Sequence, residues 1–272
     1  MGFNRQLLET ALKSGIWYNY LPSSLHIFDS VSSTNQILWD LLKNGADKNS
    51  IVIATQQTAG KGQWGRQWIS PTGGLYLSVG IVPKLEATDS YRLTLASAWG
   101  IAAQLRQWCI SVGIKWPNDL VLHGRKLGGI LTETKVHNGQ IIQAVIGVGI
   151  NWANPVPDTG INLQSWQASQ PHKAISCLEI LTSTVLLGIK SGIDCLCQEG
   201  VSVLLSRYLD LLTNIGEQVY INNLLGTVVG VTSQGKLCVS FDTDDTNEIK
   251  TPEIYMEPGT ISLGYRESSV LL

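Results

Sequence analysis

The chain has 272 residues, of which 44% are hydrophobic and 15% charged, and its formal net charge is -2. This composition is typical of a folded protein with one large domain, or one large and one small domain, and excludes a disordered chain. The small net charge without a basic run argues against a nucleic-acid-binding surface. Residues 1–15 lack the apolar core of a signal peptide, and apolar stretches such as 144–153 are too short to span a bilayer. A cytoplasmic protein with no membrane partner is therefore expected.

The first third of the chain predicts two helices and two strands. A Ser-Thr-Asn sequence at 33–35 precedes apolar residues at helical spacing and a stop at Gly45, which predicts a capped amphipathic helix. The β-rich runs 51–56 and 75–82 flank a glycine-rich loop, and 90–108 predicts a mostly buried helix.

The middle of the chain predicts a run of antiparallel strands. They are expected at 114–116, 120–122, 127–135 and 141–151, with turns at His123-Gly124 and Asn138-Gly139. An Asn-Gly pair between two apolar runs is a strong hairpin signal. A polar loop is predicted at 152–173, followed by helical periodicity from 175 to about 212 that breaks near Gly188–Gly192.

The last part of the chain changes to short strands separated by turns, predicted at 218–222, 226–232, 236–242 and 248–251. The expected fold is therefore α+β. A mixed, mainly antiparallel sheet with helices occupies residues 1–213, and a small all-β domain occupies 214–272. The alternating βα pattern of a doubly wound fold is missing.

The loop between the first two β-rich runs contains Gly60-x-Gly62-x-x-Gly65, which matches the dinucleotide-binding fingerprint literally. That fingerprint requires a helix after the third glycine, and Pro71 with the glycines beyond it exclude one here. A P-loop is excluded because Gly62 follows Lys61, where Ser or Thr is needed. A basic anion-binding loop remains, with a solvated surface loop as the alternative.

Three other polar segments interrupt apolar runs, and each has a plain structural alternative. The Ser-Thr-Asn sequence can contact a ligand or only cap its helix. Lys115 between Ile114 and Trp116 indicates a buried cation that needs an anionic partner, or an edge-strand lysine facing water. Gly147 and Gly149 indicate either close approach of the backbone to a ligand or simple packing.

Together these segments supply four cations without a matching acidic cluster: Lys61, Arg66, Lys115 and Lys126. That set indicates a ligand that carries phosphate, carboxylate or both. Five scattered cysteines without a CxxC pair or nearby histidines predict free thiols and no protein metal site.

The order and spacing of these segments resemble the biotin–protein ligases over the whole chain. The matching motifs are Ser33-Thr34-Asn35, the loop Gln57–Trp68, Lys115–Asp119, Arg125–Leu131 and Gly147–Asn151. The resemblance implies a class II synthetase-like biotin/lipoate ligase fold with a C-terminal SH3-like barrel. It also implies activation of biotin by MgATP to biotinyl-5′-AMP, and transfer to one lysine of a biotin carboxyl carrier protein of acetyl-CoA carboxylase type.

The resemblance also implies a role for each matched side chain. Ser33, Thr34, Asn35 and Gln57 would bind the biotin head group, while Lys61, Gly62 and Gln63 would close over the intermediate. Lys115 would bridge the biotin carboxylate and the α-phosphate as the catalytic cation. Arg66 and Lys126 would hold phosphate oxygens, Trp68 would cover the adenine, and Asn151 would orient phosphate or Mg²⁺.

Two departures from the family pattern affect these expectations. Where the family loop usually reads Gly-Arg-Gly-Arg, this chain has Gly60-Lys61-Gly62-Gln63, so one charge is lost and weaker retention of the intermediate is expected. About 26 residues precede the first strand that matches, too few for the helix-turn-helix domain of repressor relatives, so a ligase alone is expected.

Two rival functions stay open from the sequence. A lipoate–protein ligase or octanoyltransferase would share the fold, but the arginine–glycine-rich motif ending in His-Asp that we associate with it is missing. A non-catalytic biotin-binding module would not need four cations, because biotin carries one negative charge. The sequence leaves a monomer and a homodimer equally open.

Overall fold

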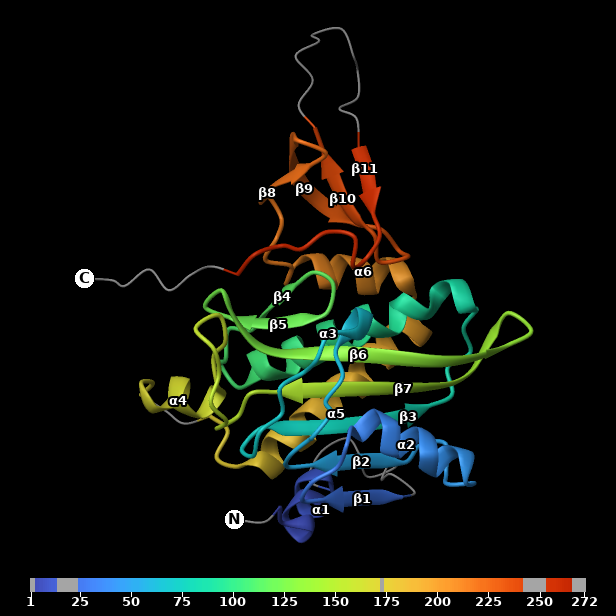
Figure 1. Ribbon diagram of the computed structural model, residues 1–272, viewed down its shortest axis with the longest axis vertical. Coiled ribbons are helices and arrows are strands. Elements are labelled where there is room, and N and C mark those ends of the chain that lie inside the picture. The colour runs from blue at the N-terminus through green and yellow to red at the C-terminus, as the bar shows by residue number, and fades with distance from the viewer. Residues whose placement is uncertain (1–2, 14–23, 172–173, 242–252, 266–272) are drawn as a thin grey trace, which may run out of the picture.

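The computed structural model describes residues 3–13, 24–171, 174–241 and 253–265. Its main element is a seven-stranded sheet with the strand order β1-β2-β3-β7-β6-β5-β4 (Figure 1). The strands are β1 (Leu25–Phe28), β2 (Ile51–Ala54), β3 (Leu75–Ile81), β4 (Gly113–Lys115), β5 (Asp119–Leu122), β6 (Arg125–His137) and β7 (Gln140–Ile150). β1 and β2 pair in parallel and the five other neighbouring pairs are antiparallel, which confirms the predicted mixed sheet.

Two tight hairpins join β5 to β6 and β6 to β7, as predicted. His123 and Gly124 have φ of 51° and 75°, and Asn138 and Gly139 have φ of 49° and 76°. Two successive positive φ values match the right-handed twist of the strands that a two-residue turn connects. The strongest local signal in the sequence therefore placed the β6–β7 hairpin correctly, and an irregularity between Lys135 and Val136 shifts the register beyond the turn.

Helices cover both faces of the sheet. They are α1 (Arg5–Lys13), α2 (Thr34–Lys43), α3 (Ser90–Gln107), α4 (Leu163–Ala168), α5 (Leu178–Asp194) and α6 (Val201–Leu209). Because strand side chains alternate, Ile51 and Ile53 join the main core with α3 and α5, whereas Val52 and Val145 pack on Leu38 of α2. Helices α2 and α3 agree with the prediction, whereas α4 lies inside the stretch predicted as a loop and is too short to show a period.

The predicted break at Gly188–Gly192 is wrong, because α5 runs unbroken to Asp194 before a π-turn at Cys195–Glu199. These glycines lie against α3: a Cβ on Gly188 would come within 2.6 Å of Ile101 Cα, and one on Gly192 within 2.0 Å of Ala96 O. They are small so that two helices can approach, and they do not interrupt the helix.

The 22-residue run Leu178–Glu199 has the length and composition of a membrane-crossing helix, which the sequence analysis did not find. More than half of its most apolar window is buried inside this fold, and α5 packs closely on α3. Its apolar character is accounted for by those contacts within the protein.

A second, four-stranded antiparallel sheet forms the C-terminal part, in the order β11-β10-β9-β8. Its strands are β8 (Gln218–Ile221), β9 (Leu224–Val231), β10 (Leu237–Ser240) and β11 (Glu253–Met256), which is compatible with the expected SH3-like domain. The strand predicted at 248–251 lies outside the described residues, and the division at residues 213 and 214 stays a prediction.

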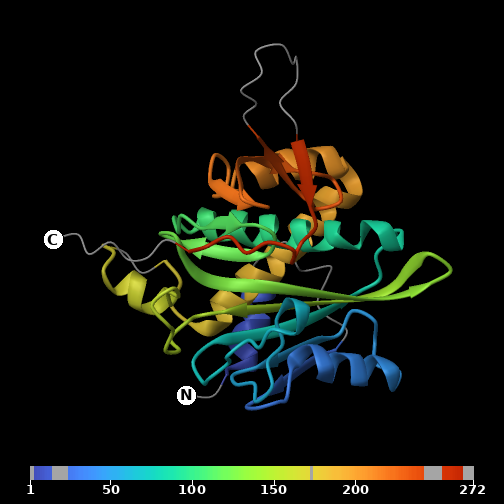
Figure 2. The same cartoon turned by 45° about the horizontal axis from the view of Figure 1, so that its top comes forward.

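The chain after β11 turns back towards the large sheet. In Figure 2 this red segment runs across the green strands β4 and β5. Trp116 Nε1 also donates a hydrogen bond of 2.8 Å to Gly235 O, which joins the strand pair β4–β5 to the second sheet. The C-terminal part is thus packed against the end of the large sheet where the predicted cationic residues lie.

Candidate active site

A pocket opens over β6 and β7. Its floor includes Gly129, Leu131, Gly147 and Gly149. Gly129 pairs with Gly149 and Leu131 with Gly147, so all four share one face of the sheet. The pocket is lined by every predicted site residue except Asn151: Ser33, Thr34, Asn35, Gln57, Lys61, Gly62, Gln63, Arg66, Trp68, Lys115 and Lys126.

The end of the pocket beside α2, called the neutral end below, is closely hydrogen-bonded through uncharged groups, with Lys61 at its exposed edge as the one cation among its described lining residues. Ser33 holds the N-cap position, but its side chain makes no capping hydrogen bond. Gln57 Oε1 accepts a hydrogen bond of 2.8 Å from the backbone N–H of Thr34, and Gln57 Nε2 donates one of 2.8 Å to Ser70 Oγ. Gln57 therefore fastens the start of α2 to the end of the glycine-rich loop.

The two glycines of β7 make room for protein side chains. A Cβ on Gly147 would come within 2.2 Å of Asn35 Oδ1, and one on Gly149 within 2.5 Å of Trp68 Nε1. The packing interpretation of these glycines is therefore confirmed, and close approach of their backbone to a ligand stays a prediction, since both also lie on the pocket floor. The Trp68 indole N–H is buried and has no hydrogen-bond partner among the described residues, while its ring forms part of the pocket wall.

The glycine-rich loop contains no α-helix, as predicted, and folds into an irregular hairpin. Trp68 N donates to Gly60 O at 2.9 Å and Gly62 N donates to Arg66 O at 2.7 Å. A short 3₁₀ turn at Gln63–Gly65 forms its tip. This backbone holds Arg66 and Lys61 on opposite sides of the loop.

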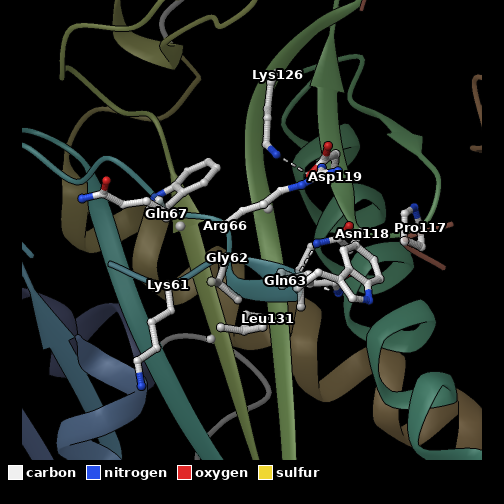
Figure 3. A pocket seen from close by; sticks show the side chains of 18 of the residues that line it. Lys61, Gly62, Gln63, Arg66, Gln67, Pro117, Asn118, Asp119, Lys126 and Leu131 are labelled. Carbon is white, nitrogen blue, oxygen red and sulfur yellow. Dashed lines mark hydrogen bonds and ion pairs between the residues drawn. The ribbon is translucent and has the colours of Figure 1, made fainter. Parts of the chain in front are cut away.

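The loop cations point in different directions (Figure 3). Arg66 extends towards Asp119 and Lys126, whereas Lys61 points away from them and donates a hydrogen bond of 3.0 Å to Gln36 Oε1. The expected group of four cations is thus divided, with Arg66, Lys115 and Lys126 gathered at one end.

At this cationic end Lys115 is buried on β4 with 8% of its surface exposed, which agrees with the prediction of a buried lysine. Lys126 Nζ lies 2.6 Å from Asp119 Oδ1, and Lys115 Nζ lies 4.0 Å from the centroid of the Tyr265 ring. Burial lowers the pKa of Lys115, Asp119 acts against that shift, and Lys126 adds to it. Burial also raises the pKa of Tyr265, whose hydroxyl contacts Asp119 and therefore stays protonated.

Asn151 lies outside the pocket lining. Its Nδ2 donates to Lys126 O at 3.2 Å, and its Oδ1 accepts a hydrogen bond of 2.9 Å from Asn154. Both polar atoms are therefore engaged within the protein, and Nδ2 holds the backbone that carries Lys126. The role implied by the family resemblance, in which Asn151 orients phosphate or Mg²⁺, stays a prediction.

Two parts of the pocket were not expected from the sequence. Asp119 is the single carboxylate among the described lining residues, although it belongs to the Lys115–Asp119 motif. The returning C-terminal segment contributes Gly259, Ile261, Ser262 and Leu263. No local signal marks that segment, because its place depends on the packing of the second sheet.

The model of the "Biotin/lipoate A/B protein ligase family" matches residues 27–151. The bifunctional ligase/repressor BirA of Escherichia coli (strain K12) is 34% identical over 230 residues, which cover 80% of this chain and 70% of that protein. The chain belongs to the biotin protein ligase family. This membership confirms the resemblance drawn from the motifs.

Two further comparisons agree with a biotin protein ligase. The biotin–[acetyl-CoA-carboxylase] ligase of Paracoccus denitrificans is 35% identical over 123 residues, covering 44% of this chain and 50% of that protein. The biotin protein ligase from Aquifex aeolicus, solved with biotin and ATP, superposes with a TM-score of 0.65 at 21% identity, covering 85% of this chain and 95% of that one. This likeness shows the shared fold.

Proposed function

We propose that this biotin protein ligase activates biotin with ATP and transfers it to one lysine of the biotin carboxyl carrier domain of acetyl-CoA carboxylase. In the first step a biotin carboxylate oxygen bonds to the α-phosphorus and pyrophosphate leaves, giving biotinyl-5′-AMP. In the second step the lysine ε-amine attacks the anhydride carbonyl, loses a proton and releases AMP. The attacking nucleophile belongs to the carrier, so the ligase needs none.

The observation that carries this proposal is the division of one pocket into a neutral end, with Lys61 alone at its edge, and a cationic end where the three other lining cations gather. Ser33, Thr34 and Gln57 offer the uncharged hydrogen-bonding groups that suit a ureido head group. Lys115, Lys126 and Arg66 gather where a carboxylate and a triphosphate must meet. Biotin has these two kinds of group at opposite ends of one molecule.

Lys115 is the cation that we assign to the first reaction step. Two anions approach each other there, and negative charge builds on the oxygens around phosphorus. Lys115 is held by β4, buried and placed beside the Tyr265 ring, so its ammonium needs little reorganisation. Arg66 and Lys126 would hold further phosphate oxygens, and the Trp68 ring would form the wall against the adenine.

Mg²⁺ is implied with ATP, and the pocket fits a metal carried in with the nucleotide. Mg²⁺ is commonly bound by one or two carboxylates together with substrate phosphates and water. Asp119 supplies one carboxylate, and no cluster of three or more acidic, His or Cys ligands occurs among the described residues. Asp119, whose two oxygens contact Lys126 and Tyr265, is thus the residue that would hold the ion in exchange for one of those contacts, and the charge of the ion would offset that of the phosphates.

The carrier protein is the proposed macromolecular partner, supported by the named activity of the Paracoccus relative. We propose ligase activity without a repressor function, because the net charge is -2 and no basic run offers a surface for DNA. We place the reaction in the cytoplasm. The several relatives named as ligase/repressors make DNA binding a separate question for a mobility-shift assay.

Biotin-dependent exchange of labelled pyrophosphate into ATP tests the first step without a carrier. We expect exchange with biotin and none with lipoate or octanoate. Exchange with lipoate alone would identify a lipoate ligase, and no exchange with any acid would identify a binding module. Adding a carrier domain and a variant without its target lysine then tests the second step.

A further inference from the structure

A continuous chain of hydrogen bonds leads from the neutral end of the pocket to a carboxylate outside it. Glu133 Oε2 accepts from Asn35 Nδ2 at 2.7 Å and from Trp39 Nε1 at 3.2 Å. Asn35 Oδ1 lies 2.6 Å from Ser78 Oγ, which lies 2.8 Å from Thr34 Oγ1. Thr34 and Asn35 line the pocket, whereas Ser78 and Glu133 do not.

The sheet places these groups in two adjacent rows. Ser78 of β3 pairs with Gly147, and Glu133 of β6 pairs with Val145, so their side chains share the face of the sheet on which α2 lies. The missing side chain of Gly147 leaves the space that the Asn35 amide fills. Asn35 can therefore bridge the two strands.

Glu133 fixes which atom donates and which accepts in each hydrogen bond of this series. A carboxylate accepts hydrogen bonds and an indole N–H donates them, so the Asn35 amide must turn its Nδ2 towards Glu133 and its Oδ1 towards Ser78. The Ser78 hydroxyl has one proton, which it donates in its short hydrogen bond to Asn35 Oδ1. Ser78 can then only accept from Thr34.

The Thr34 hydroxyl proton is consequently held within the protein. Its partner is Ser78 Oγ at 2.8 Å, or Gln57 Oε1 at 3.2 Å, and Gln57 Oε1 already accepts from the Thr34 backbone N–H. In either case the side of Thr34 Oγ1 that faces the pocket presents a lone pair. A ligand atom that meets it must be a donor.

We propose that Glu133 and Ser78 are positioning residues that fix Thr34 as a hydrogen-bond acceptor and so select a ligand with an N–H group at that point. This inference rests on the proposed function, in which the N–H belongs to the ureido ring of biotin. A ligand with an oxygen in that place would set two lone pairs against each other. The selectivity therefore originates in a carboxylate that does not touch the ligand.

The test compares binding of biotin with binding of the two cyclic carbamate analogues, in each of which an oxygen replaces one ureido N–H. Titration calorimetry on the full chain gives the ratio of the analogue Kd to the biotin Kd, and the analogue with the larger wild-type ratio is used. Glu133→Leu removes the acceptor, so the Asn35 amide can turn over and the Thr34 proton becomes available to the pocket. Glu133→Gln keeps an acceptor oxygen for the Asn35 amide N–H, so the orientation of that amide is preserved.

We expect the ratio to fall roughly tenfold or more in Glu133→Leu and in Ser78→Ala, and to stay near wild type in Glu133→Gln. Ser97→Ala is the matched control, since Ser97 is equally buried but bonds to Leu93 O in α3. An unchanged ratio in both Glu133→Leu and Ser78→Ala, with both Kd values raised alike, would reduce the two residues to a structural role. Failure of the wild type to bind biotin would overturn the proposed function itself.

Discussion

The two ends of the pocket differ in the burial of their side chains and in the segments that form them. At the α2 end, Ser33, Thr34 and Asn35 are at most 4% exposed, and Thr34 and Asn35 belong to a hydrogen-bond network that is anchored on the sheet and reaches the Glu133 carboxylate. At the other end, Arg66 is exposed and Lys126 is half-buried, and two walls are a loop and a returning segment. The neutral end is part of the core, whereas at the cationic end surface segments enclose the buried Lys115 of β4.

This difference assigns separate tasks to the two ends. The neutral end is complete before a ligand arrives, so we expect it to set the affinity for biotin. The cationic end is closed by segments that meet each other: a Cβ on Gly259 would lie 2.5 Å from the Trp64 ring of the loop. We expect that end to set the rate of adenylate formation and the retention of the intermediate.

The largest effect is expected from Lys115→Ala. Removing a preorganised cation at the point where charge develops should lower the rate of biotinyl-AMP formation by roughly 10²–10³-fold. Biotin affinity should change far less. Single-turnover formation of the adenylate measures the rate, with Thr34→Val as the comparison that should raise the Kd for biotin instead. If Lys115→Ala lowers the rate of biotinyl-AMP formation by less than fivefold, the cationic end does not set that rate and the two ends do not have separate tasks.

The protonation of Lys115 gives the next largest effect. Because burial lowers its pKa, the ammonium should be lost as the pH rises through a value below the ordinary 10.5. The rate of adenylate formation should fall over that range, while biotin binding at the neutral end should not follow it. Lys115→Arg keeps its charge at alkaline pH, so its profile should stay flat there even if its rate is lower. If the rate falls at the same alkaline pH in the wild type and in Lys115→Arg, the group that titrates is not Lys115.

Gln63 tests retention of the intermediate. Its Oε1 accepts from Tyr91 at 3.1 Å, and its Nε2 lies 3.5 Å from Ile130 O, so it makes only neutral contacts. Gln63→Arg would add a charge-assisted contact to the adenylate, and each 1.4 kcal/mol gained slows release about tenfold. Stopped-flow dissociation of biotinyl-AMP measures this. Equal or faster release from the arginine variant would show that another residue already retains the intermediate.

The smallest effect is expected from Tyr265, whose ring lies over Lys115. Loss of a cation–π contact of about 1 kcal/mol in Tyr265→Ala should lower the rate of adenylate formation about fivefold. Tyr265→Phe keeps the ring and should stay close to wild type in the same single-turnover assay. A faster Tyr265→Ala enzyme would mean that the C-terminal segment obstructs the nucleotide end of the pocket.

The sequence by itself determined the features that depend on neighbouring residues. The Asn138-Gly139 turn followed from the ease with which these two residues adopt positive φ. The positions of most strands along the chain and most of the pocket-lining residues followed from short motifs. These motifs can be recognised in the sequence because the polar groups of each lie within a few residues of one another.

Only the tertiary structure decided the features that depend on contacts between distant residues. Gly188 does not break its helix, because it lies against α3, and Asn151 turns from the pocket to hold Lys126. Lys61 and Arg66, five positions apart, point in opposite directions because the loop folds back on itself. The acceptor character of Thr34 depends on Glu133, 99 positions away along the chain. A hydrogen bond has a direction only when both partners are in place, and that requires the folded sheet.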